Sequence, residues 1–172
     1  IAEPLVASVS RSTGERVKFV AGGETRQQSV IRGFAEVQDA DLVAIHDAAR
    51  PLFSAAMFHA VVEAAREVGA AIPVMPVTDT IHLMNDDETI ASTLDRSMLG
   101  AAQTPQCFRT DILRRELDRA AAERIEGTDE AGLAARFGFI VKAVPGDRRN
   151  VKITVPEDLV IAESYLREWG QM

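Results

Sequence analysis

Short apolar runs that alternate with segments of helical period are the feature that most limits the fold of this 172-residue chain. Three runs are predicted strands, at residues 16–20, 42–46 and 71–77. The segments between them, 25–37 and 54–68, have the apolar spacing of helices. No charge interrupts the run at 42–46, which is typical of a strand buried on both faces of a parallel sheet. This βαβαβ spacing predicts an α/β fold with a mostly parallel sheet, right-handed crossovers and helices on both faces.

Capping residues and periodicity predict three more helices in the second half of the chain. We expect them from 110 to about 122, from 128 to 138 and from 154 to about 169. Thr110 and Thr128 are the predicted N-caps of the first two, and a capping-box pattern opens the third. Two more strands are expected at 139–144 and 151–154. No linker or repeat interrupts the chain, so we expect a single domain over residues 1–172.

A β-hairpin arm is predicted where the α/β alternation stops. Residues 80–84 and 89–94 are short extended segments on either side of an Asn-Asp-Asp-Glu turn. A two-stranded hairpin cannot bury its apolar side chains by itself. We therefore expect this arm, at about residues 80–96, to pack on another surface such as a second subunit.

Composition excludes several classes of protein. The net charge is −7, the isoelectric point is near 5.0, and no apolar run approaches the length of a membrane span. A nucleic-acid or anionic-membrane partner is therefore not expected, because such partners require a basic surface. The single Cys107 excludes an internal disulfide and fits a reducing, cytoplasmic setting. The three histidines lack the spacing of zinc ligands.

Two polar clusters follow predicted strands of the first half. Residues 22–29, Gly-Gly-Glu-Thr-Arg-Gln-Gln-Ser, offer glycine flexibility and backbone N–H groups that suit an anion or a nucleotide, although an ordinary βα turn has the same composition. Asp47 and Arg50 lie at the carboxyl end of a predicted strand, where open α/β sheets bind ligands. Asp47 could hold Mg²⁺ and Arg50 could pair with a phosphate. A local Asp–Arg turn is the alternative.

Two further clusters lie in the second half of the chain. Thr104 and Thr128 offer hydroxyl groups to phosphate oxygens, although Thr128 could also be a routine N-cap. Arg148, Arg149 and Lys152 place three positive charges within five residues of an acidic chain. An anion is expected there, and a charged edge strand is the alternative.

Together the motifs resemble those of the 2-C-methyl-D-erythritol 4-phosphate cytidylyltransferases. Seven segments follow one another in that family's order and spacing, and the resemblance covers about residues 20–166. It implies a Rossmann-like nucleotidyltransferase of the non-mevalonate isoprenoid pathway, cytoplasmic and homodimeric, that joins CTP to methylerythritol phosphate with Mg²⁺. The segments are residues 22–30, 46–51, 76–80, 95–96, 104–108, 128–131 and 151–159.

The same resemblance assigns roles to individual residues. Those that match the family's nucleotide contacts are Gly22, Gly23, Glu24, Ser29 and Asp47, and Asp47 is also the expected metal ligand. The methylerythritol phosphate site is implied to contain Arg50, Thr104, Thr128 and Lys152, completed by Thr80 and Arg96 of the partner subunit. The residues implied to act in catalysis are Lys152, Asp47 and Arg96.

One departure concerns the start of the chain. The family begins with a strand and a glycine-rich loop, Ala-Ala-Gly-x-Gly-x-Arg, followed by a Pro-Lys pair, and residues 1–16 match neither. We expect a fragment that lacks at least one βαβ-sized unit of ~30 residues, and without that loop the chain as given is expected to be inactive. Some members are fused to the cyclodiphosphate synthase of the same pathway. Two other interpretations stay open: a cytidylyltransferase for another polyol phosphate, such as ribitol 5-phosphate, and a non-catalytic dimeric relative.

Overall fold

The computed structural model describes residues 17–169, which fall into two compact units that part between Asp39 and Ala40. The first unit contains helix α2 (Arg26–Ala35), which Thr25 caps by accepting a hydrogen bond from the Gln28 N–H at 3.3 Å. The predicted strand at 16–20 is wrong for residues 17–20, which have no regular structure; Arg16 lies outside the described residues. A strand needs a neighbour to pair with, and the described part of this unit contains no other strand.

The second unit is built on a five-stranded sheet. Three of its strands run in one direction, as the sequence predicts: β1 (Leu42–Ile45), β2 (Ala70–Pro76) and β7 (Lys142–Pro145). Two strands that the sequence did not predict, β5 (Gly100–Ala102) and β6 (Gln106–Arg109), run the opposite way. Strand β6 lies between β1 and β2, so both of its pairings are antiparallel, and only β7 pairs with β2 in parallel.

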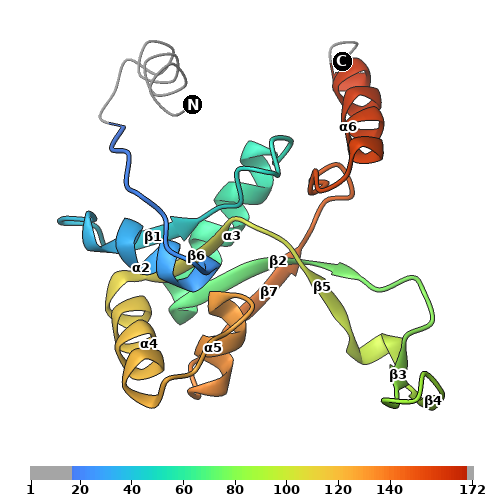
Figure 1. Ribbon diagram of the computed structural model, residues 1–172. Helices are drawn as coiled ribbons and strands as arrows, with labels where there is room; N and C mark the ends of the chain where they lie inside the picture. The colour runs from blue at the N-terminus through green and yellow to red at the C-terminus, as the bar shows by residue number, and fades with distance from the viewer. Residues whose placement is uncertain (1–16, 170–172) are drawn as a thin grey trace. The chain divides into compact units, whose positions relative to one another are not determined.

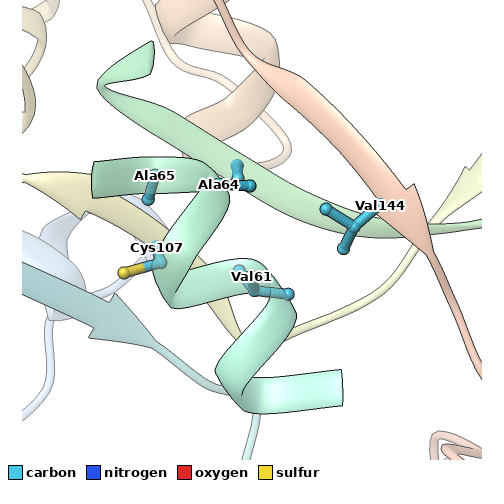
Figure 2. Packing of buried hydrophobic residues seen from close by; sticks show 6 residues of the cluster. Val61, Ala64, Ala65, Cys107 and Val144 are labelled. Carbon is cyan, nitrogen blue, oxygen red and sulfur yellow. The ribbon is translucent and has the colours of Figure 1, made fainter. Parts of the chain in front are cut away.

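Helix α3 (Ala55–Val68) covers one face of this sheet. Ser54 caps it by accepting a hydrogen bond from the Met57 N–H at 3.1 Å, and Gly69 ends it with a φ of 105°, as predicted. Small side chains let the helix pack closely on the sheet, and Figure 2 shows Val61, Ala64 and Ala65 beside Cys107 and Val144. Ala71 completes this cluster, and the partly buried Leu42 of β1 packs against it.

Helices α4 (Thr110–Glu123) and α5 (Glu130–Arg136) pack together and contact β6 and β2. Side chains alternate along a strand, so Phe108 points away from the face that Cys107 presents to α3. Figure 1 shows α4 and α5 on that other side of the sheet. Both predicted caps are corrected. The N-cap of α5 is Asp129, whose carboxylate accepts a hydrogen bond from the Gly132 N–H. The Asp129 side chain is one atom longer than that of Thr128, the predicted cap. Thr110 is the first residue of α4 and follows the N-cap position.

The predicted arm is confirmed as a hairpin of β3 (His82–Met84) and β4 (Ile90–Thr93). It extends beyond the ends of β2 and β5 (Figure 1), and a 3-10 turn at Arg96–Met98 follows it. Its apolar side chains are exposed: Leu83 by 51%, Met84 by 56% and Ile90 by 59%. The arm therefore has no core of its own within the described chain.

The last helix, α6 (Pro156–Trp169), ends at the predicted residue and begins two residues after the predicted start at 154. Its start is held by Asp158 instead of Glu157, since the Asp158 carboxylate accepts hydrogen bonds from the backbone N–H groups of Thr154 and Val155 and from the Thr154 hydroxyl. The predicted strand at 151–154 is wrong. Within the described chain, a single backbone hydrogen bond connects this segment to a neighbouring one, from the Ile153 N–H to the Ala49 carbonyl at 2.8 Å. One such bond is too little for a strand. No helix among residues 17–169 is long and apolar enough to cross a bilayer.

A buried carboxyl group lies between α4 and α5. Glu116 is fully buried, and neither of its carboxyl oxygens has a hydrogen-bond partner among the described residues. Burial raises the pKa of Glu116 to about 8, and the nearby carboxylates of Glu130 and Asp129 add to this effect. The folded protein therefore holds a proton on Glu116 at neutral pH.

We expect the stability of the fold to depend on the pH through Glu116. The unfolded chain releases this proton above the ordinary pKa of 4.5, whereas the folded chain keeps it to about pH 8. The free energy of unfolding should therefore fall across that interval, by roughly 4 kcal/mol at most. In Glu116→Gln, the urea midpoint should change much less between about pH 5 and about pH 8.5.

The matched control is Glu123→Gln on the same helix, because Glu123 forms an exposed ion pair with Arg119. That variant should keep the pH dependence of the wild type. If the midpoint of Glu116→Gln falls in parallel with the wild type, Glu116 is ionised in the fold and the prediction is wrong.

Candidate functional site

The site forms around Asp47, two residues beyond the end of β1. Its Oδ2 atom lies 3.0 Å from Lys152 Nζ and 3.9 Å from Arg50 Nε. The side chains of Asp47 and Arg50 are largely buried, with 18% and 13% exposed, whereas Lys152 is 44% exposed. One carboxylate thus holds two cations at the rim of the sheet, and the lysine is the one that faces solvent.

Hydrogen bonds fix the backbone that carries Asp47. The Asp47 N–H donates to Thr104 Oγ1 at 3.0 Å, and Thr104 Oγ1 lies 2.9 Å from His46 Nδ1. His46 Nε2 lies 2.9 Å from the Arg50 carbonyl, which can only accept, so Nε2 carries a proton and donates. In the neutral ring, Nδ1 then accepts from the Thr104 hydroxyl. His46 and Thr104 therefore hold both ends of the Asp47–Arg50 loop.

Arg50 is positioned by a buried carbonyl group. Its Nη1 atom donates to the Asn150 carbonyl at 2.7 Å, and burial lowers its pKa. The Arg50 Nε–H is buried and has no hydrogen-bond partner among the described residues, since 3.9 Å to Asp47 is too long for one. A buried donor that stays unpaired costs free energy, so this N–H is available to a ligand oxygen.

The turn at residues 146–150 joins the cluster through Gln103. Gln103 accepts a hydrogen bond from the Asp147 N–H at 3.1 Å and donates to the Asp147 carbonyl at 2.9 Å. A Cβ added at Gly146 would lie 2.7 Å from Gln103 Oε1, so the chain passes close to this amide. Arg149 pairs with the Asp147 carboxylate at 2.8 Å, and this hydrogen bond lowers the pKa of Asp147.

The cluster fits a metal ion only in part. No group of three or more His, Cys, Asp or Glu side chains in the described chain could hold a metal ion. Asp47 is a single carboxylate, and two cations already approach it. Mg²⁺ is commonly bound by one or two carboxylates together with substrate phosphates. The residues present therefore fit Mg²⁺ shared with a phosphate ligand, and they do not form a site made of protein alone.

The Gly22–Ser29 turn lies in the first unit and is tightly built. A Cβ at Gly23 would lie 2.2 Å from the Gln28 Cβ, so only glycine fits there. The N–H groups expected to be available are already bonded: that of Gly23 donates to Ser29 Oγ at 2.9 Å, and that of Glu24 to Gln28 Oε1 at 2.9 Å. The turn therefore presents a fixed surface, and a ligand at those two N–H groups would have to displace side chains.

The structure brings together four of the predicted site residues: Asp47, Arg50, Thr104 and Lys152. Among the described residues no hydrogen bond or ion pair joins the other three of this unit to the cluster. Thr128 is exposed before α5, and Thr80 is exposed ahead of β3. Arg96 donates to the Thr78 carbonyl at 2.8 Å, at the base of the arm.

Sequence reasoning assigned no role to three polar residues that hold this cluster: His46, Gln103 and Asn150. Each of them lies in a motif that drew attention because of the residues next to it. The signal that could have found them is a neutral polar side chain beside a buried strand end, where an unpaired polar group is costly and a specific partner is required.

Comparison with known proteins places the chain in one family. A family model described as 2-C-methyl-D-erythritol 4-phosphate cytidylyltransferase matches residues 4–168, so the match begins earlier than the sequence motifs. A curated protein of that name from Caldanaerobacter subterraneus subsp. tengcongensis is 45% identical over 152 residues, which are 88% of this chain and 67% of the relative. The chain spans 65% to 67% of the length of three such relatives, about two thirds.

Solved structures agree. The crystal structure of 2-C-methyl-D-erythritol 4-phosphate cytidylyltransferase from Thermus thermophilus matches with a TM-score of 0.79 and 39% identity, covering 89% of this chain and 77% of that one. The bifunctional IspDF from Campylobacter jejuni matches with a TM-score of 0.73 and 28% identity, covering 90% of this chain and 39% of that one. The α/β fold expected from the sequence is confirmed.

Proposed function

This chain belongs to the 2-C-methyl-D-erythritol 4-phosphate cytidylyltransferase family, and we propose that it catalyses cytidylyl transfer from CTP to 2-C-methyl-D-erythritol 4-phosphate. The products are 4-diphosphocytidyl-2-C-methyl-D-erythritol and pyrophosphate, in non-mevalonate isoprenoid biosynthesis. The observation that carries the proposal is the Asp47 cluster, in which a buried arginine and a half-exposed lysine meet one carboxylate at a strand end. Two phosphorylated substrates need such cations in a chain of net charge −7.

The reaction is an in-line displacement at phosphorus. A phosphate oxygen of methylerythritol phosphate attacks the α-phosphorus of CTP and forms a new P–O bond. The bond from the α-phosphorus to the bridging oxygen breaks, and pyrophosphate leaves with that electron pair. The step needs positioning and charge neutralisation more than a general base, which suits Arg50 and Lys152.

Individual residues take the following parts in this proposal. Lys152, the most exposed of the cluster, meets the phosphomonoester as a point charge. Arg50 presents its unpaired Nε–H to the same phosphate, beside the Thr104 hydroxyl, and Thr128 extends the site. The cytidine lies against the turn that contains Gly22, Gly23, Glu24 and Ser29.

Asp47 is the proposed ligand of Mg²⁺, held jointly with nucleotide phosphate oxygens. When bound, the metal supplies charge neutralisation at the phosphates. Asp47 also keeps Lys152 at the site through their 3.0 Å ion pair. The Asp47 carboxylate would thus hold Lys152 and bind the metal at the same position.

We propose a homodimer in which the arm crosses to the other subunit. The exposed apolar side chains of the arm support this proposal, since a hairpin without a core must pack on another surface. Thr80 and Arg96 of the partner subunit would then complete the phosphate site. The single cysteine, Cys107, is free and buried, which suits a reducing compartment, and we propose that the protein acts in the cytoplasm.

Pyrophosphate release tests this function directly. The complete gene product that contains this chain, purified and supplied with CTP and Mg²⁺, should release pyrophosphate when methylerythritol phosphate is added, and much less with ribitol 5-phosphate. A preference for ribitol 5-phosphate would assign the chain to another polyol phosphate. Binding of both substrates without any release would favour a non-catalytic relative.

Lys152→Ala should chiefly impair the use of methylerythritol phosphate. The variant removes the cation that faces solvent, so the KM for methylerythritol phosphate should rise about tenfold or more, while the KM for CTP changes little. Lys142→Ala is the matched control, because Lys142 pairs with Glu67 on the surface at 2.7 Å. An equal rise of both KM values would indicate that Lys152 contacts the triphosphate of CTP instead.

A further inference from the structure

We propose that Asn150 is the positioning residue of this site, and that its buried amide sets where Lys152 and Arg50 meet the phosphate. This inference rests on the proposed function for its catalytic consequence, and on the structure alone for its geometry. Asn150 is fully buried, although its neighbours Arg148 and Lys152 are exposed. A polar side chain in such a place is retained only where it has specific partners.

The Asn150 side chain ties its own segment to the Thr104 segment. Its Nδ2 atom donates to the Thr104 carbonyl at 2.8 Å and approaches Gln103 Oε1 at 3.4 Å. Thr104 in turn accepts the Asp47 N–H through Oγ1. The Asn150 amide therefore fixes Thr104, which in turn holds the backbone of Asp47.

The Asn150 main chain ties the same segment to Arg50. Its carbonyl accepts from Arg50 Nη1 at 2.7 Å, and three residues later the Ile153 N–H donates to the Ala49 carbonyl at 2.8 Å. Lys152 lies between these two anchors, and its Nζ reaches Asp47 at 3.0 Å. The position of Lys152 is thus set by contacts on both sides of it.

These contacts meet at Asn150. The three segments that supply the site are 46–50, 103–104 and 147–152, and the Asn150 side chain binds the second while its carbonyl binds the first. Its Oδ1 atom is buried without a hydrogen-bond partner among the described residues, so the side chain is held by the hydrogen bonds that Nδ2 donates. Removing that donor should let residues 147–152 shift relative to Thr104 without emptying the core.

The first test uses the three lysines of the chain, Lys18, Lys142 and Lys152. Reductive methylation with ¹³C-formaldehyde keeps their charge and gives each one an NMR signal, assigned with single Lys→Arg variants. In Asn150→Leu, which keeps the side-chain size and removes the amide, the Lys152 signal should move in the direction that Asp47→Asn moves it. The Lys18 and Lys142 signals, whose lysines pair with Glu36 and Glu67, should stay in place.

The second test measures both substrates. Asn150→Leu and Asn150→Asp each remove the donor, so each should raise the KM for methylerythritol phosphate about tenfold while the KM for CTP stays within about twofold. Val61→Ala, a core change in α3, controls for lowered stability and should move neither KM nor the Lys152 signal.

The inference is overturned if the Lys152 signal of Asn150→Leu stays at the wild-type position, or if both KM values rise together as in a merely weakened fold. A wild-type protein without turnover would overturn the proposed function alone, because the lysine signals still decide whether Asn150 positions Lys152.

Discussion

Asp47→Asn is expected to lower kcat/KM for cytidylyl transfer by at least about 10²–10³-fold. The amide keeps the size of the side chain and the backbone N–H that donates to Thr104, so the fold should persist. It removes the charge that pairs with Lys152 and Arg50, and it offers Mg²⁺ a poor ligand. Steady-state pyrophosphate release at saturating Mg²⁺ measures the loss.

The control is Asp111→Asn, which makes the same chemical change in an exposed ion pair with Arg109. Both variants should unfold cooperatively, and Asp111→Asn should keep wild-type kinetics. Wild-type activity in Asp47→Asn would reduce Asp47 to a turn residue, and the proposed metal site would be lost with it.

A mixture of two inactive variants is expected to regain activity if the arms cross. Arg96→Ala removes the side chain at the base of the arm, and Asp47→Asn disables the body of the site. In a heterodimer one site would receive an intact Asp47 from its own chain and Arg96 of the partner subunit. Random pairing makes half of the dimers mixed, each with one working site, so activity should reach about a quarter of the wild type.

Subunit exchange has to be shown in the same mixture, by mass spectrometry of differently tagged chains. In the control mixture, Arg148→Ala replaces Asp47→Asn as the partner of Arg96→Ala, because Arg148 is another exposed arginine of the same unit. The activity of this mixture should not exceed that of the Arg148→Ala chains that it contains. If exchange is complete and the Arg96→Ala and Asp47→Asn mixture stays as inactive as its parents, each site is built from one chain.

The elements that the sequence predicts best are those whose signals are local. Helix α3 has a capping serine, an apolar stripe and a terminal glycine, and its bounds match the prediction closely. The hairpin arm has a turn of polar residues between two apolar runs. Each of these signals lies within the element itself, so no knowledge of the neighbours is required.

The elements that the sequence misses depend on distant partners. Strand β6 has only four residues, and it is a strand because β1 and β2 flank it on both sides. Residues 151–154 have a β-like composition, yet one backbone contact holds them, so they are not a strand. The cations and the carboxylate of the site were predictable from motif and charge. Asn150 was not, because its importance comes from contacts more than 40 residues away along the chain.

The break between β5 and β6 also constrains how this chain can vary in length. Residues 103–105 join two short strands that pair with successive parts of β2. A one-residue slip of β6 against its neighbours would turn it over, and Phe108 would face the small side chains of α3 in place of Cys107. A phenyl ring there would replace a much smaller thiol in the cluster that Val61, Ala64 and Ala65 form with Cys107. A change of length at this point is therefore expected to be tolerated only if β6 keeps its register, which also holds Thr104 beside the residue that follows β1 by two positions, Asp47.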